Sequence, residues 1–100
     1  MTDAPALEKN EPPELTSPRA VLANRYINFR SEVLQIQIQA LRGIDSPNSN
    51  IQDALLIAES ELKQLKNDKQ LVNKGDFDVA DIYRDRELAR QKELAKLRKQ

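Results

Sequence analysis

The sequence predicts an all-α protein: an antiparallel, coiled-coil-like helical hairpin, followed by a third, charged helix and preceded by an extended N-terminal segment. Three observations lead to this prediction. Of 100 residues only 2 are glycine and 32% are charged, a composition that favours long helices over sheets. Apolar residues recur at alternating spacings of three and four in two successive segments. Turn-forming residues separate those two segments.

The first helix is expected over residues 18–42. Ser17 is a favourable N-cap, and Pro18 suits the first helical position because it lacks an amide that this position would leave unbonded. A row with heptad spacing, expected to face the second helix, consists of Leu22, Tyr26, Phe29, Val33, Ile36 and Ala40. A neighbouring row, which widens the apolar face, consists of Ile27, Leu34, Ile38 and Leu41. Residues 34–39 alternate as a strand would, but helical periodicity continues on both sides of them.

A chain reversal is expected at residues 43–50, which are rich in turn formers, and a second helix at residues 51–73. Asn50 is the expected N-cap, with Asp53 completing a capping box. The heptad row of this helix consists of Ile51, Leu55, Ala58, Leu62, Leu65, Lys69 and Val72. Two matched rows joined by a short turn predict antiparallel packing of the two helices. Lys69, the polar member of the row, either extends its ammonium group to solvent or sets the helix register.

A third helix is expected over residues 78–100, after a C-cap at Lys74–Gly75. Asp78 is its expected N-cap, and Phe77 is expected to contact Ile82. From residue 84 onward, seven basic residues accompany three acidic ones, and the core-facing stripe thins out. The basic residues are expected to dock on an acidic protein surface, and the alternatives are a solvated face that only keeps the protein soluble and a nucleic-acid contact. They are Arg84, Arg86, Arg90, Lys92, Lys96, Arg98 and Lys99.

Residues 1–16 are predicted to form an extended or disordered acidic tail. This segment has four acidic residues, one basic residue and three prolines. Proline removes amide donors and disfavours helix in the residue before it. The segment lacks the basic and apolar blocks of a signal peptide, and no apolar run is long enough to cross a bilayer. We therefore expect a cytoplasmic protein without membrane contact, or one inside a viral particle if it is a phage protein.

The composition argues against an enzyme. The sequence contains no cysteine and no histidine, so thiol nucleophiles, imidazole bases and the usual zinc ligands are missing. With two glycines it cannot form a glycine-rich phosphate-binding loop. The four aspartates in residues 76–85 do not follow a calcium-loop pattern and are better explained by helix capping. We expect no catalytic residue, no metal and no cofactor.

The apolar arc of the first helix is wider than one neighbouring helix can cover, which predicts a further protein surface. The residues expected to bury or bind that surface are Leu22, Tyr26, Phe29, Val33, Ile36, Leu55, Leu62 and Leu65. We expect a structural or assembly component that forms homo-oligomers or joins a larger complex. Small coiled-coil proteins with charged ends occur among phage scaffolding and virion components, an analogy of composition alone. An adaptor or inhibitor that clamps an enzyme, and a nucleic-acid-binding accessory, are the alternatives.

Overall fold

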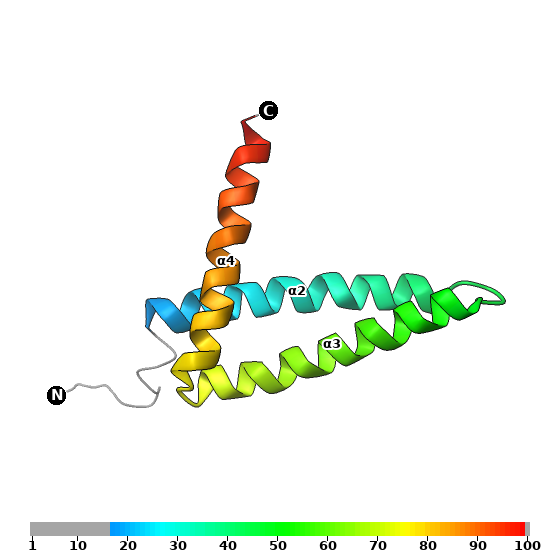
Figure 1. The fold of residues 1–100 in the computed structure, drawn as a ribbon, viewed down its shortest axis with the longest axis horizontal. Coiled ribbons are helices and arrows are strands. Elements are labelled where there is room, and N and C mark those ends of the chain that lie inside the picture. Colours follow the sequence, from blue (N-terminus) through cyan, green and yellow to red (C-terminus); the bar gives the residue numbers. More distant parts are fainter. Residues whose placement is uncertain (1–16, 100) are drawn as a thin grey trace.

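The computed structural model describes residues 17–99 and contains three helices in that range. They are α2 (Pro18–Arg42), α3 (Ser49–Asn73) and α4 (Phe77–Arg98). Helices α2 and α3 form an antiparallel hairpin, and α4 lies across α2 near the open end of the hairpin (Figure 1). The all-α fold predicted from the sequence is therefore confirmed. The predicted acidic tail, residues 1–16, lies outside the described residues.

Helix α2 begins and ends as its sequence predicts. The Ser17 side chain accepts a hydrogen bond of 3.1 Å from the amide of Ala20, and Pro18 follows as the first helical residue. Gly43 ends the helix, with its amide donating to the carbonyls of Gln39 and Ala40. Proline and a small polar cap at the start, and glycine at the end, are the residues that local backbone chemistry favours there.

The start of α3 differs from the prediction. Asn48, not Asn50, is the N-cap, and its side-chain oxygen accepts a hydrogen bond of 2.9 Å from the amide of Ile51. Ser46 adopts a left-handed backbone conformation with φ of 52°, and the chain reverses within the residues before Asn48. The sequence segment contains two asparagines with equal capping ability, so local preference alone does not choose between them.

Glycine determines how the chain passes from α3 to α4. Gly75 has φ of 96°, and its amide donates to the carbonyl of Val72, while the amide of Asp76 donates to the carbonyl of Leu71. These two bonds define a Schellman motif, which confirms the predicted C-cap at Lys74–Gly75. The motif places Asp76 at the N-cap of α4, where it accepts from the amide of Val79.

Two predictions at the start of α4 are thus wrong. Asp78 is not the cap, because the chain already enters α4 at Phe77. Phe77 is largely exposed and so is Ile82, and the ring of Phe77 lies against the Arg19 guanidinium of α2, 4.6 Å from its centroid. A cation–π contact to the neighbouring helix thus covers one face of this ring.

The core of the hairpin uses the neighbouring row on α2 rather than the predicted one. Ile27, Leu34 and Ile38 are buried, whereas Phe29 and Ile36 of the predicted row are exposed. On α3 the predicted row does face inward: Ala58, Leu65 and Val72 are buried, and Leu55 and Leu62 pack against the core. Both rows on α2 have the rhythm of a packed helix, so periodicity could not decide which one faces α3.

Polar side chains also join α2 to α3 along the length of the hairpin. Lys69 donates to the side-chain oxygen of Asn28 across 2.7 Å, so it bonds to the partner helix instead of extending into solvent. Asn24 donates to Asn73, and Arg30 and Arg42 form ion pairs with Glu61 and Glu59. Because each bond joins a specific pair of positions, together they fix the relative register of the two helices.

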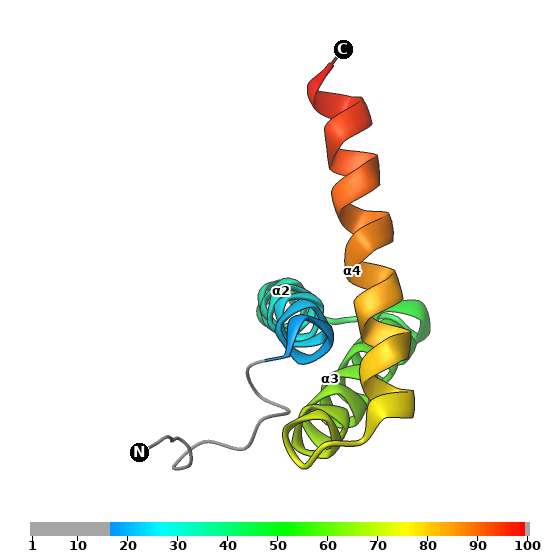
Figure 2. The same ribbon diagram turned by 90° about the vertical axis from the view of Figure 1, so that its left-hand side faces the viewer.

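Helix α4 packs across the open end of the hairpin and then extends beyond it. Ala80 and Tyr83 are buried in one cluster with Ala20 and Ala23 of α2, where small side chains allow the helix backbones to approach closely. The second half of α4 projects away from both other helices (Figure 2). Helix α4 therefore both closes the core with its first half and projects with its second half.

We predict different effects for alanine at the two glycines. Gly75→Ala should lower the free energy of unfolding by about 1 kcal/mol, because L residues disfavour the left-handed conformation found there. Gly43→Ala is the matched control. Gly43 has φ of −82°, and a Cβ atom there would lie 3.6 Å from its nearest neighbours, an ordinary contact. Its effect should be neutral or slightly stabilising in urea unfolding monitored by circular dichroism. Equal losses in the two variants would contradict the proposed role of Gly75.

Candidate interaction surfaces

Tyr83 attaches α4 to both helices of the hairpin. Its ring is buried and lies 6.0 Å from the ring of Tyr26 on α2. Its hydroxyl group donates a hydrogen bond to the carboxylate of Asp68 on α3. Burial, together with this hydrogen bond and the negative charge of Asp68, raises the pKa of Tyr83 to about 12. Tyr83 is thus the point at which all three helices meet.

Glu87 is a fully buried carboxylate one turn further along α4, with 0% of its surface exposed. It accepts two hydrogen bonds from Arg90, at 2.8 and 2.9 Å, and a third of 2.8 Å from Gln91. The bonds from Arg90 hold the pKa of Glu87 below its ordinary value despite the opposing effect of burial. The Arg90 guanidinium also lies over the ring of Phe29 on α2, 4.3 Å from its centroid. The ion pair therefore attaches α4 to α2 as well as neutralising the buried charge.

The structure divides the seven predicted docking cations into two groups. Three of them interact within the chain: Arg84 pairs with Asp81 and Asp85, Arg86 lies over the Tyr83 ring, and Arg90 binds Glu87. The four remaining cations are exposed on the projecting half of α4, and within the described residues no ion pair joins them to other side chains. They are Lys92, Lys96, Arg98 and Lys99. The candidate docking cations are therefore these four residues at the end of α4.

The predicted apolar binding residues also divide into buried and exposed groups. Leu65 is buried, and five others are half-buried: Leu22, Tyr26, Val33, Leu55 and Leu62. Phe29 is 40% exposed but lies against Arg90, whereas Ile36 is 64% exposed on the same row. Half of this predicted set, namely Leu65, Tyr26, Leu55 and Leu62, belongs to the core or packs against it, and Ile36 is the most exposed member.

A surface that the sequence analysis did not identify runs along α3 to the first half of α4. Leu56 and Ile57 are 65% and 68% exposed, and with Ser60 they line a hollow along α3. A second hollow, between α3 and α4, shares two lining residues with it, Glu61 and Gln64. The second hollow is also lined by Leu65, Asp68, Val79, Ile82, Tyr83 and Arg86. We call this continuous surface the α3–α4 groove. The side-by-side pair Leu56–Ile57 outside the heptad row was the sequence signal that could have revealed it.

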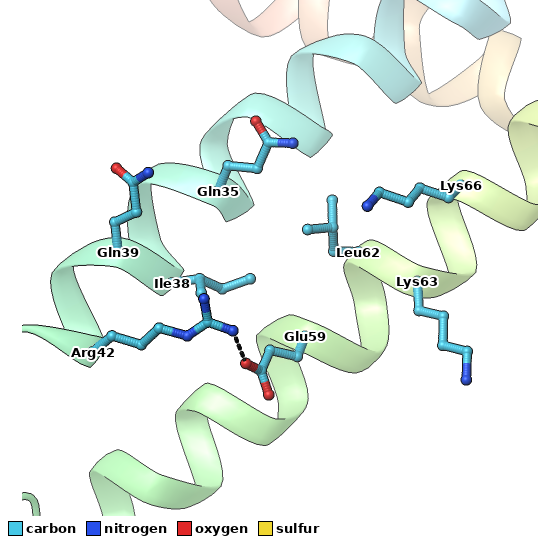
Figure 3. A pocket seen from close by; sticks show the side chains of 8 residues that line it. All are labelled: Gln35, Ile38, Gln39, Arg42, Glu59, Leu62, Lys63 and Lys66. Atoms are coloured by element: carbon cyan, nitrogen blue, oxygen red, sulfur yellow. Dashed lines mark hydrogen bonds and ion pairs between the residues drawn. The ribbon is translucent and has the colours of Figure 1, made fainter.

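Another hollow lies on the hairpin between α2 and α3 and has a mixed lining (Figure 3). Ile38 and Leu62 form its apolar part, and the side chains of Gln35 and Lys66 extend toward the gap between the helices. The ion pair between Arg42 and Glu59 spans the two helices beside it. Two of the charged side chains that line this hollow, Arg42 and Glu59, are thus bound to each other and help to hold the hairpin together.

Within residues 17–99 the structure contains no group of three or more acidic side chains arranged to hold a metal ion. The same residues include no helix that is both long and apolar enough to cross a membrane. No protein family, curated protein or solved structure matches this chain. The candidate sites therefore have to be argued from the geometry of the chain itself.

We predict that Glu87→Gln lowers the free energy of unfolding by about 2 kcal/mol at neutral pH, because the substitution leaves Arg90 without its buried carboxylate. The folded-state pKa of Glu87 lies below its ordinary value of 4.5, so its stabilising contribution is present above that pH. The contribution is lost as the pH falls through the folded-state pKa. The difference between variant and parent in urea unfolding should therefore shrink on acidification. Glu93→Gln, an exposed substitution on the same helix, is the control and should change stability by less than about 0.5 kcal/mol.

We predict that Tyr83 stays un-ionised in the folded protein until the pH approaches 12. Its folded pKa is raised above the ordinary value of 10, so its contribution to stability is complete below pH 10 and declines between pH 10 and about 12. The variant Tyr26→Phe leaves Tyr83 as the single tyrosine, so near-ultraviolet absorbance then reports the ionisation of Tyr83 alone. Circular dichroism on the same samples shows over which pH range the protein stays folded. Ionisation of Tyr83 near pH 10 in the folded protein would contradict its burial and its hydrogen bond to Asp68.

Proposed function

We propose that this protein is a non-enzymatic helical protein–protein interaction module that acts as a structural or assembly component of a larger complex. The observation that carries the proposal is the α3–α4 groove. Three large apolar side chains, Leu56, Ile57 and Ile82, are more than half exposed along one continuous surface. Several large apolar side chains exposed along one surface mark an interaction site more strongly than single exposed apolar residues, which are common everywhere.

The composition of the groove suits a helical partner. Its exposed apolar side chains are accompanied by polar ones: Glu61 and Gln64 line both hollows, and Asp68 and Arg86 line the second. Some of these polar side chains are held in place from within the chain, since Arg30 binds Glu61 and Tyr83 binds Asp68. A partner helix with apolar residues on one face could lie along α3 and contact the base of α4. Pre-positioned side chains lower the entropy lost on binding.

The exposed positions on α2 support an assembly of more than two surfaces. Ile36 lies on α2, whereas Leu56 lies on α3, and neither residue belongs to the hairpin core. None of the hollows described above is lined by both residues, so separate partner surfaces would have to cover them. This favours a structural component over an adaptor with one binding face.

We predict that Leu56→Ser/Ile57→Ser removes the protein from its complex without unfolding it. Both side chains are largely exposed and contribute little to the core, so the helical circular dichroism signal should be retained. Gradient sedimentation of extracts from the native source, followed through an epitope tag, should place the parent protein in particles well above twice the chain mass of 11.4 kDa. The variant should sediment as free protein.

The matched control is Gln52→Ser/Asp53→Ser, two exposed polar positions on the same helix. It should sediment like the parent. A parent protein that sediments only as free chains, or a Leu56/Ile57 variant that stays in the large particles, would contradict the proposed function.

A further inference from the structure

The outer face of α4 carries charges in a regular order. Asp78, Asp85, Lys92 and Lys99 follow one another at intervals of seven residues. On an α-helix such residues drift by only about 20° per step, so the four side chains form a single stripe. All four are exposed. We call this set the outer stripe.

The outer stripe lies on the opposite side of α4 from the residues that pack against the hairpin. Asp85 and the buried Glu87 are two residues apart, which places them about 200° apart around the helix. The hairpin therefore does not cover the stripe. Figures 1 and 2 show α4 at one side of the hairpin, with its second half extending past α2. A second protein can approach this face along its whole length.

The two halves of the outer stripe mirror each other in position but carry opposite charges. Its midpoint falls between Leu88 and Ala89, both exposed, with Leu88 at 47%. Asp85 and Lys92 are equally far from that midpoint, and so are Asp78 and Lys99. Acidic residues near the start of a helix and basic ones near its end favour the helix dipole, but that effect does not require them to share one face.

We propose that the outer stripe binds the outer stripe of a second copy of this chain, with the two α4 helices side by side and antiparallel. In this arrangement Asp85 faces Lys92 of the second copy, and Asp78 faces Lys99 of the second copy. The apolar Leu88 and Ala89 meet their counterparts at the centre. A two-fold axis through the midpoint generates every contact twice, as in other isologous dimers.

Charge complementarity identifies the occupant. A parallel pair would place aspartate against aspartate and lysine against lysine, which is unfavourable. A nucleic-acid backbone would attract the lysines but would be repelled by Asp78 and Asp85. An unrelated acidic helix would match one half of the stripe only. A second copy in antiparallel orientation matches both halves, and complementarity of this kind favours the correct partner even where each exposed ion pair is weak.

Sedimentation equilibrium of the purified full-length protein tests the proposal. At low ionic strength the mass should rise with concentration from 11.4 kDa toward twice that value, and added salt should weaken the association. Lys92→Glu/Lys99→Glu should weaken dimerisation about tenfold or more, because it places like charges at four contacts in each dimer. Adding Asp78→Lys/Asp85→Lys reverses the whole stripe and should restore the dimer to within about threefold of the parent.

Lys63→Glu/Lys66→Glu makes the same change in net charge on exposed positions of α3 and is the control. It should leave the dimer constant unchanged. A parent protein that stays monomeric at every concentration would overturn the proposal. So would equal losses in the control and the stripe variant, or a fully reversed stripe that fails to dimerise while circular dichroism shows it folded.

Cross-linking tests the antiparallel orientation. The sequence contains no cysteine, so the double variant Asp78→Cys/Lys99→Cys provides two unique sites. Within one helix these sites are about 31 Å apart, beyond the span of a short bis-maleimide. Covalent dimers should form with the double variant and with neither single variant. Dimers from the single variants would show a parallel arrangement and overturn the proposal.

This inference concerns a different face from the α3–α4 groove and does not rest on the proposed function. A dimer that forms normally while the protein is absent from any large particle would refute the proposed function alone. A protein that sediments in large particles from the native source but is monomeric when pure would refute the dimer alone.

Discussion

The attachment of α4 across α2 determines the form of this protein. Two helices of 25 residues can bury only one face of each against the other, and α2 has apolar residues over a wider arc. Helix α4 covers part of that arc, because Tyr83 packs beside Tyr26 of α2 and Arg90, held by Glu87, lies over the Phe29 ring of α2. These contacts extend along α4 no further than Arg90, and the rest of the helix projects beyond the hairpin. The interaction surfaces follow from this single crossing.

The charged residues of α4 form an internal ion pair near its middle and an exposed row along its outer face. Near the middle of α4 the buried carboxylate of Glu87 is balanced by Arg90, and in the first half the exposed Asp78 and Asp85 lie on the other side of the helix. Within the second half, lysines continue the outer stripe without intramolecular partners. The buried, neutralised charge and the exposed charges thus lie on opposite sides of one helix, because residues two apart point in opposite directions. The α3–α4 groove is a third feature, formed where α3 meets the base of α4.

Prediction from the sequence succeeded where local chemistry or strict periodicity dominates. Ser17–Pro18 and Lys74–Gly75 delimit helices through their own backbone preferences, and the row on α3 faces inward. Prediction failed where two residues, or two rows of residues, suit the same position equally well. Asn48 and Asn50 can both cap a helix, and α2 has two apolar rows with the same rhythm. The α3–α4 groove was missed because residues from two separate helices form it, and no one-dimensional pattern joins Leu56 to Ile82.

The sequence by itself determined that the chain is helical, where two of its turns lie, and that its last helix is acidic first and basic last, because these properties depend on residues close together along the chain. Only the tertiary structure decided which face of each helix is covered. The crossing of α4 over α2 decides which row of α2 is buried, and it places one of the seven candidate cations, Arg90, against the Phe29 ring of α2. That selection depends on how side chains from distant segments pack in three dimensions, and helical periodicity describes each segment separately.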